Sequence, residues 1–177
     1  MKRLILITSA TLLVTPLGAT AQRTQKPVLH GKHWIAITGK PMAATAGSMM
    51  YQRGCIAVDA AAAMLAATAT MWDVLSWGGE TQALIYHPGE KRVIALNALG
   101  VAPAGATPEY FRDKGYEFPP EYGVDAMVTP GTPGGLITMV AEWGKLSLAD
   151  VLAPAIEMTE GYPVEAGASR QIQGEAE

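Results

Sequence analysis

Cys55 is the only cysteine of the sequence and the first candidate for a nucleophile. A reactive thiolate needs a cationic or helix-terminal neighbourhood. Arg53 is close in the sequence, but no histidine lies near Cys55. We therefore interpret Cys55 as a small apolar side chain of the interior and not as a catalytic residue. A single cysteine also fits an exported protein that does not rely on disulfides.

His30 and His33 have a spacing that two ligands of one metal ion can have, and His87 is the only other histidine. A protein zinc site needs three or four ligands. No cluster of cysteine, histidine and carboxylate residues accompanies this pair in the sequence. The sequence therefore predicts no metal site.

The segment from Thr129 to Gly135 has the glycine content of a phosphate-binding loop. A Walker loop, however, enters its helix through Gly-Lys-Ser/Thr, and Lys145 lies beyond the helix predicted here. Pro130 and Pro133 also lack the amide protons that a phosphate would bind. We predict a tight turn that leads into a packed helix.

Ser76 lies in the sequence Ser-Trp-Gly-Gly, which differs from the Gly-x-Ser-x-Gly elbow of serine hydrolases. The carboxylates of the later loops are interpreted as solvated surface and not as acid–base pairs; they are Asp113, Glu117, Glu121 and Asp125. No set of residues in the sequence supplies an activated nucleophile with its base and oxyanion donors. We therefore predict no catalytic residue and no cofactor-binding residue within this chain.

The composition is that of a folded domain. The 177 residues are 49% hydrophobic and 16% charged, which excludes wholesale disorder and allows one domain with a core. The net charge of -3 gives no basic surface, so nucleic acid is not an expected partner.

The amino terminus has the pattern of a secretory signal peptide in residues 1–21. Met1-Lys2-Arg3 is basic, Leu4 to Leu17 is largely apolar, and Ala19-Thr20-Ala21 predicts cleavage before Gln22. The alternative is a membrane anchor, but the apolar run is shorter than the ~20 residues that a membrane span needs. We expect a periplasmic or secreted protein with a polar leader over residues 22–33.

Three elements are predicted next along the chain. Trp34 to Thr38 is predicted as a strand, and Met42 to Gln52 as a helix closed at Gly54. Ile56 to Met71 is rich in alanine and free of glycine and proline, which predicts the strongest helix of the chain.

This helix is expected in the core, through side chains that share one face: Val58, Ala61, Ala62, Leu65, Thr68 and Ala69. Its small side chains would let neighbouring elements approach closely. For Asp59 two roles stay open, a cap at the amino end of the helix and a bond to an amide of a neighbouring loop.

A hairpin is predicted from Gln82–His87 and Arg92–Leu96 around Pro88-Gly89-Glu90-Lys91. Apolar residues alternate along its first strand on both faces, so we expect helices on both sides of the sheet. Further helices are expected from Pro108, with Thr107 as N-cap, from Leu136 to Trp143, and from Leu148 to about Glu160, with Ser147 as N-cap. In the last, Pro154 predicts a kink or two shorter helices.

Four sequence blocks occur in an order that resembles the γ-glutamyltranspeptidase family. They cover most of the chain from Met42 to Val164 and are Ala46–Gly54 with Ala57–Ala63, Trp77–Gly79 with Ala83–Tyr86, Ala102–Ala104 with Ala106–Pro108 and Phe111, and Thr129–Leu136 with Leu152–Ala155 and Tyr162–Val164. Each block alone is a weak signal. Their order makes the resemblance specific.

The resemblance implies an α/β (α+β) fold, the αββα sandwich of the N-terminal-nucleophile hydrolases, which residues 34–177 contain in part. It implies a precursor that cuts itself into two subunits, with a threonine at the new amino terminus of the small subunit as nucleophile. The implied substrates are γ-glutamyl or related acyl amides, as in glutathione metabolism. That threonine belongs to the later part of the family, so this chain alone is expected to be inactive and to need a small subunit or a carboxy-terminal continuation.

Two residues depart from the family's pattern. Leu99 occupies the position at which the family has an arginine that binds the α-carboxylate of the glutamyl group, and Arg92 lies too early in the sequence to replace it. Glu80 follows a shortened glycine run, Gly78-Gly79. The presence of Leu99 in place of that arginine predicts that the protein binds glutathione-like substrates more weakly.

We therefore hypothesise a fragment of an exported γ-glutamyltranspeptidase-like amidohydrolase or acyltransferase. The alternative is a catalytically inactive remnant, or a scaffold subunit that depends on a partner. A third hypothesis, with the least support, is an independent periplasmic domain that binds a small molecule.

Overall fold

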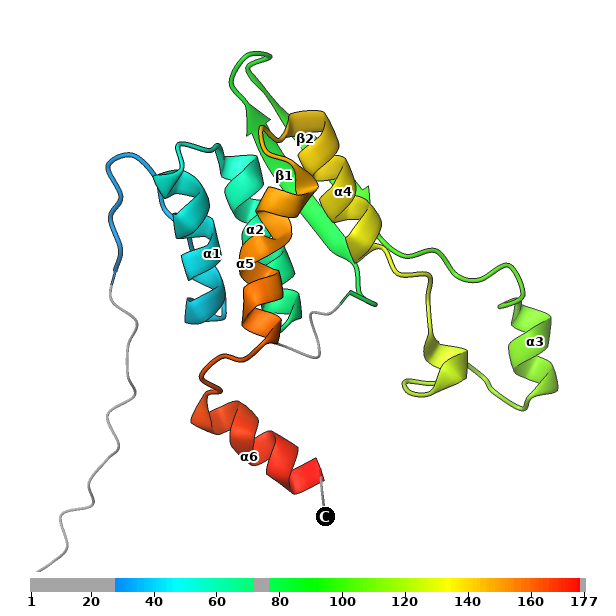
Figure 1. The fold of residues 1–177 in the computed structure, drawn as a ribbon. Coiled ribbons are helices and arrows are strands. Elements are labelled where there is room, and N and C mark those ends of the chain that lie inside the picture. Colours follow the sequence, from blue (N-terminus) through cyan, green and yellow to red (C-terminus); the bar gives the residue numbers. More distant parts are fainter. Residues whose placement is uncertain (1–27, 72–76, 176–177) are drawn as a thin grey trace, which may run out of the picture. The chain divides into compact units, whose positions relative to one another are not determined.

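A computed structural model describes residues 28–71 and 77–175 (Figure 1). The chain divides into two compact units, residues 1–30 and residues 31–177. The predicted signal peptide and residues 22–27 of the predicted polar leader lie outside the described residues. The second unit contains every helix and strand described below.

The first two helices form a close pair. Helix α1 spans Pro41–Gln52 and α2 spans Ala57–Ala69, as their sequence patterns predict, and Gly54 joins them with a φ of 76°. A Cβ at Gly47 of α1 would lie 2.8 Å from the Met64 side chain of α2, so a larger residue there would displace Met64 where the two helices cross.

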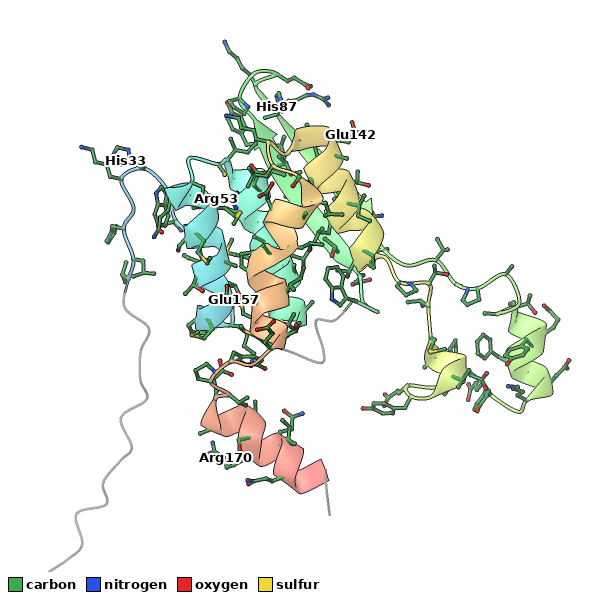
Figure 2. All side chains as sticks on the ribbon, viewed as in Figure 1. His33, Arg53, His87, Glu142, Glu157 and Arg170 are labelled. Atoms are coloured by element: carbon green, nitrogen blue, oxygen red, sulfur yellow. The ribbon has the colours of Figure 1, made fainter. Side chains whose placement is uncertain are left out.

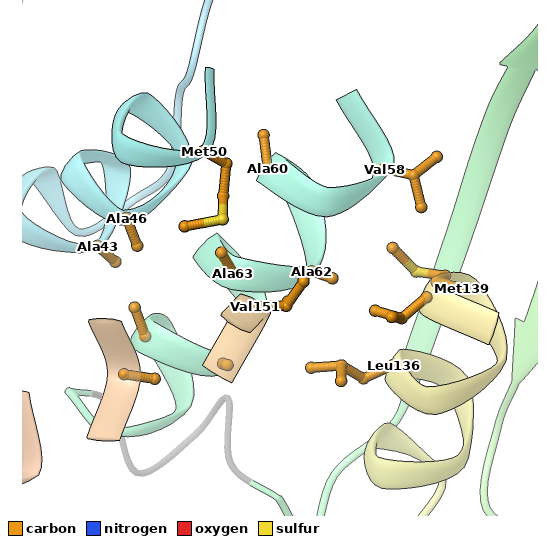
Figure 3. Close-up of a cluster of buried hydrophobic side chains, with 14 of the residues drawn as sticks. Ala43, Ala46, Met50, Val58, Ala60, Ala62, Ala63, Leu136, Met139 and Val151 are labelled. Atoms are coloured by element: carbon orange, nitrogen blue, oxygen red, sulfur yellow. The ribbon is translucent and has the colours of Figure 1, made fainter. Parts of the chain in front are cut away.

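Helix α2 is the centre of the core and contacts α1, α4 and α5. Val58, Ala62 and Thr68 of the predicted face are buried, whereas Ala61, Leu65 and Ala69 are half-buried. The buried surface extends instead to other residues of the helix: Asp59, Ala60, Ala63, Ala66 and Ala67. The core cluster includes Met50 of α1, Leu136 of α4 and Val151 of α5, which surround α2 in Figure 3. Small side chains make this possible because they let three helices approach one helix closely.

The hairpin is confirmed. Strand β1, Thr81–His87, pairs antiparallel with β2, Arg92–Ala98, in the register Leu84 to Ala95 and His87 to Arg92. Residues 88–91 form the turn, in which the His87 Nδ1 atom accepts the amide of Glu90 at 3.1 Å. Arg92 forms an ion pair with Glu90.

Only one face of the hairpin is covered, which corrects the expectation of helices on both sides. Helix α4, Thr132–Trp143, contacts both strands, and a Cβ at its Gly135 would lie 2.6 Å from the Cβ of Ala98. On the opposite face Leu84 is 79% exposed and Tyr86 63%. The described residues supply no second helical layer for that face.

Helix α5, Leu148–Thr159, packs on α2, and the side chain of its N-cap residue Ser147 accepts the amide of Asp150 at 3.2 Å. The helix is continuous with Pro154 inside it, so the alternative of two shorter helices is wrong. A further helix, α6, spans Ala166–Glu175 and was not expected. The Nζ atom of Lys40 lies 2.6 Å from the Glu165 carboxylate just before α6.

Residues 102–128 form a long excursion between β2 and α4, referred to below as the arm. It contains α3, Pro108–Asp113, capped by Thr107 as predicted, and the short helix η1, Val124–Ala126. Neither helix has a buried residue. The arm is therefore held by polar contacts and by the packed rings of Tyr110, Phe111 and Tyr116, without a buried core of its own.

The predicted strand from Trp34 to Thr38 is wrong, because no described segment pairs with it. The Trp34 ring stacks instead on Tyr51 of α1, with 4.8 Å between ring centroids. The Thr38 hydroxyl accepts the amide of Lys40 at 3.0 Å, at the start of α1. Tertiary contacts with α1 thus replace the pairing that β-branched and aromatic residues suggested.

Candidate functional site

Two of the sequence blocks, Trp77–Gly79 and Thr129–Leu136, meet at the start of α4. The carbonyl oxygen of Gly79 accepts the amides of Gly131 at 3.0 Å and Thr132 at 3.1 Å. The hydroxyls of Thr81 and Thr132 are 3.2 Å apart and buried. The turn before β1 is therefore fixed to the turn before α4, although about fifty residues separate them in the sequence.

The end of β2 joins the same place. The amide of Thr129 donates to the carbonyl of Val101 at 3.0 Å. A Cβ at Gly100 would lie 1.8 Å from the Thr129 carbonyl oxygen, and one at Gly131 would lie 2.1 Å from the Ala98 carbonyl oxygen. Only glycine permits backbones to approach this closely, so both glycines fix the geometry at this point.

Beside this junction lies a shallow hollow of about 430 Å³ on the uncovered face of the hairpin. Its lining is mainly apolar and includes Leu84, Ala95 and Leu99. The side chains of Gln82 and Asn97, which are opposite each other in the register, are also part of it. The Asn97 Oδ1 atom accepts the amide of Leu99 at 3.1 Å. This bond uses the Asn97 oxygen and leaves its NH2 group, beside the Gln82 amide, as a hydrogen-bond donor of the hollow.

No cation lines the hollow. Leu99, which is 45% exposed, forms part of its wall. Arg92 is at the opposite end of β2, where it pairs with Glu90. Glu80 is exposed and is not among the lining residues. The hollow can therefore hold an uncharged group, with one amide pair to orient it, and it presents no ionic partner for a carboxylate.

The remaining candidate residues lie elsewhere. Cys55 is a half-buried free thiol packed against the core cluster. His33 projects from the segment before α1 and His87 from the end of β1 (Figure 2). In the described part of the chain no three histidine, cysteine or carboxylate side chains are close enough to hold a metal ion. Ser76 lies outside the described residues.

Among the four loop carboxylates, Asp125 has specific partners. It accepts hydrogen bonds from Lys114 Nζ, at 2.9 Å and 3.0 Å, and from the Tyr110 hydroxyl at 2.7 Å. These bonds, that from Lys114 first, lower the pKa of the Asp125 carboxyl below its ordinary value. Asp113, Glu117 and Glu121 are exposed. The Asp125 cluster joins η1 to α3 and closes the arm.

Asp59 has both of the roles that the sequence left open. One carboxylate oxygen accepts the amide of Ile56 at 3.3 Å, at the start of α2. The other accepts the amides of Lys145 at 2.9 Å and Leu146 at 3.2 Å, in the turn between α4 and α5. The residue is fully buried. The sequence could suggest a buried carboxylate from its place in an alanine-rich helix, but not the turn that it binds.

Among residues 28–71 and 77–175, no helix is long and apolar enough to span a membrane.

Comparison with known proteins places these blocks in a family. Residues 43–177 match the family described as Gamma-glutamyltranspeptidase. The chain is 32% identical over 146 residues to a protein named Glutathione hydrolase proenzyme from Bacillus subtilis (strain 168), with 79% of this chain and 25% of the relative covered. It is 29% identical to a protein named Acylase ACY 1 proenzyme from Pseudomonas sp. (strain SE83), with 77% and 26% covered.

Solved structures give the same result. The γ-glutamyltranspeptidase of Helicobacter pylori superposes with a TM-score of 0.76 at 27% identity, over 84% of this chain and 44% of that chain. The cephalosporin acylase of Bacillus halodurans superposes with a TM-score of 0.67 at 34% identity, over 77% and 27%. The predicted fold class is confirmed, and it is partial here, because this chain spans about a quarter of the length of the curated relatives it matches.

Proposed function

This chain belongs to the γ-glutamyltranspeptidase family, and we propose that it is the amino-terminal part of an exported amidohydrolase or acyltransferase of that family. The convergence of Gly79, Gly100 and Thr129–Thr132 beside the hollow carries the proposal. This junction is built from two of the sequence blocks that resemble the family, together with the segment that follows β2. The polypeptide that adds the nucleophilic threonine and its base would follow this part in the complete protein.

In this proposal the hollow is one wall of the acyl-binding site. A wall that includes Leu84, Ala95 and Leu99 binds apolar atoms by excluding water. The cross-strand amides of Gln82 and Asn97 can hydrogen-bond an uncharged polar group. A carboxylate placed here would lose hydration without gaining a cation, so we propose that the acyl group is neutral near Leu99 and is not a standard γ-glutamyl group.

The experiment is a chimera in which residues 43–177 of this chain replace the matched quarter of the Bacillus subtilis glutathione hydrolase proenzyme. Its kcat/KM is measured with a γ-glutamyl anilide and with a neutral acyl anilide of similar length. We expect turnover of the neutral anilide to exceed that of the γ-glutamyl anilide. The variant Leu99→Arg supplies a charge-assisted hydrogen bond, and this should raise γ-glutamyl turnover by about 10- to 100-fold.

Leu99→Gln is the matched control, because it introduces polarity at the same position without charge. Equal turnover of both anilides by the unmodified chimera would refute the neutral acyl group and leave the rest of the proposal standing. A folded chimera that turns over neither anilide would refute the catalytic role. It would favour the alternative, a catalytically inactive remnant or a scaffold subunit that needs a separately encoded partner.

The coding DNA beyond the codon for Glu177 provides an independent test. The proposal expects an in-frame continuation, or an adjacent reading frame, that encodes a segment able to begin with a nucleophilic threonine. Export is tested by fusing residues 1–21 to a reporter that is active only outside the cytoplasm. Deletion of Leu4 to Leu17 should abolish the reporter signal if these residues form the apolar part of a signal peptide.

A further inference from the structure

The uncovered face of the hairpin carries two facing amide side chains. Gln82 of β1 is directly opposite Asn97 of β2, and the next pair on the same face is Leu84 opposite Ala95. Residues directly opposite each other in an antiparallel pair have Cβ atoms about 4.5–5.5 Å apart, so their side chains can interact. Both pairs line the hollow of about 430 Å³. The amide pair is therefore the polar part of a hollow that is otherwise mainly apolar.

The backbone determines how the amide group of Asn97 is turned. Its Oδ1 atom accepts the amide of Leu99, two residues further along the chain, at 3.1 Å. Asparagine side chains commonly form this bond to the backbone. If the amide group were turned over, its NH2 group would face the N–H of Leu99, and two donors would meet without an acceptor. The oxygen is therefore held by the backbone, and the NH2 group is the part that a ligand can bind.

Gln82 does not alter the kind of partner that the pair favours. Its amide can turn either the oxygen or the NH2 group toward a neighbour. When the oxygen accepts from Asn97, the NH2 group of Gln82 is left for the hollow, and otherwise the NH2 group of Asn97 is left. Both arrangements present an N–H donor. Among the described residues that line the hollow, none carries a charge, so the matching partner is an uncharged acceptor.

We propose that the acyl group of the substrate carries a second, uncharged carbonyl, whose oxygen accepts a hydrogen bond from the Gln82–Asn97 pair. The class comprises acyl chains with a ketone, ester or amide carbonyl. The inference rests on the proposed function, since it requires that the hollow binds the acyl group. A plain hydrocarbon chain would exclude water and leave the donor without a partner. An ammonium group would place donors against a donor.

The test uses the chimera with the Bacillus subtilis proenzyme described above and three anilides that share a six-carbon acyl chain. The fifth carbon carries a ketone oxygen in the oxohexanoyl anilide, only hydrogen in the hexanoyl anilide, and an ammonium group in the aminohexanoyl anilide. We expect kcat/KM for the oxohexanoyl anilide to exceed both other values by about 3- to 10-fold, which is the net effect of one hydrogen bond.

Asn97→Asp should change the order of the three substrates. Aspartate keeps an oxygen that accepts the amide of Leu99, so the local fold is retained, and it replaces the NH2 group by a second, anionic oxygen. The oxohexanoyl anilide should lose its advantage, and the aminohexanoyl anilide should become the best substrate. Gln173→Glu makes the same change from amide to carboxylate at an exposed position of α6, and it should leave the order unchanged.

The outcomes separate this inference from the proposed function. An active chimera that turns over the oxohexanoyl and hexanoyl anilides equally would overturn the inference and leave the proposed function standing. A variant Asn97→Asp that lowers all three values by the same factor would also overturn it, because it would show a purely structural role for Asn97. A folded chimera that turns over none of the three anilides would count against the proposed function.

In that last case binding is measured on the 177-residue chain itself. Asn97 is the only asparagine of the sequence, so isotope-labelled asparagine gives NMR signals from a single side-chain NH2 group. The chain is titrated with oxohexanoyl amide and with hexanoyl amide. Larger shifts of the NH2 signals with oxohexanoyl amide would support the inference without catalysis. Equal shifts with the two amides would overturn it.

Discussion

At the scale of single residues, Asp59 connects segments that lie far apart in the sequence. Its carboxylate accepts three backbone amides, one at the start of α2 and two in the turn between α4 and α5. A Cβ at Gly144 would lie 2.9 Å from the Asp59 Oδ1 atom, so the glycine allows the turn to approach the carboxylate. Because Asp59 is fully buried, water cannot replace these bonds when they are lost.

We expect Asp59→Ala to lower the free energy of unfolding by about 2–4 kcal/mol, because three buried amides lose a charged acceptor. Asp59→Asn should also destabilise the chain, since an amide group offers one acceptor oxygen where the carboxylate offers two. Urea unfolding followed by circular dichroism measures the change. The control is Asp113→Ala at an exposed position of α3. Equal stability of the Asp59 and Asp113 variants would contradict the structural role of Asp59.

Gly100 gives a second prediction at this scale. Gly100→Ala should distort the junction beside the hollow, because its Cβ would lie 1.8 Å from the Thr129 carbonyl oxygen. Gly105→Ala is the matched control, since no atom lies within 4 Å of its Cβ. In the chimera we expect a loss of turnover for Gly100→Ala and unchanged turnover for Gly105→Ala. Unchanged turnover for both would show that the junction does not position the acyl-binding wall.

At the scale of elements, the sequence predicted helix caps and the hairpin correctly because the hydrogen bonds that form them join residues close in the sequence. Ser147 and Thr107 cap their helices as predicted, and the Pro-Gly turn gives the hairpin. The segment Trp34–Thr38 failed as a strand because strand formation needs a partner elsewhere in the chain. Pro154 did not divide α5, because burial of Val151 and Ala155 stabilises the helix on both sides of the proline.

The arm gives a prediction of pH dependence. Lys114 and Tyr110 lower the pKa of Asp125 in the folded state, so this cluster stabilises the arm above the ordinary pKa of aspartate. The contribution is lost as the pH falls through the lowered value of the folded state. NMR of the side-chain carboxyl carbon should give an Asp125 midpoint below the ordinary value. Lys114→Met should raise that midpoint, and a midpoint that does not move would contradict the assignment.

At the scale of the whole molecule, the hairpin leaves apolar side chains in contact with water. Leu84 is 79% exposed, Tyr86 63% and Val93 58%, all on the face that α4 does not cover. Exposed sheet faces and edges of this kind promote association. The same surfaces are available to the polypeptide that the relatives contain beyond the matched quarter.

We expect the isolated chain to bind an apolar fluorescent dye and to scatter light increasingly with concentration. The double variant Leu84→Lys/Tyr86→Lys should reduce both signals without a large change in Tm, because neither side chain is buried. The control is Ile156→Lys, at an exposed position of α5 with 59% exposure. A larger effect of Ile156→Lys than of the double variant would place the associating surface elsewhere.

The sequence by itself determined the features that depend on neighbouring residues and on the order of the blocks. These are the helices α1 and α2, the hairpin, the helix caps, the family, and the presence of Leu99 in place of a cation. Only the tertiary structure decided that Gly79, Gly100 and Thr132 meet. It also decided that Asp59 accepts the amides of Lys145 and Leu146. Finally, it left one face of the hairpin and the opening between α2, β1 and α4 uncovered by the described residues. The physical reason is the sequence separation between the groups that interact. Capping and turn formation are settled within a few residues, whereas a buried carboxylate, a close backbone approach or a strand edge depends on segments that only the folded chain brings together.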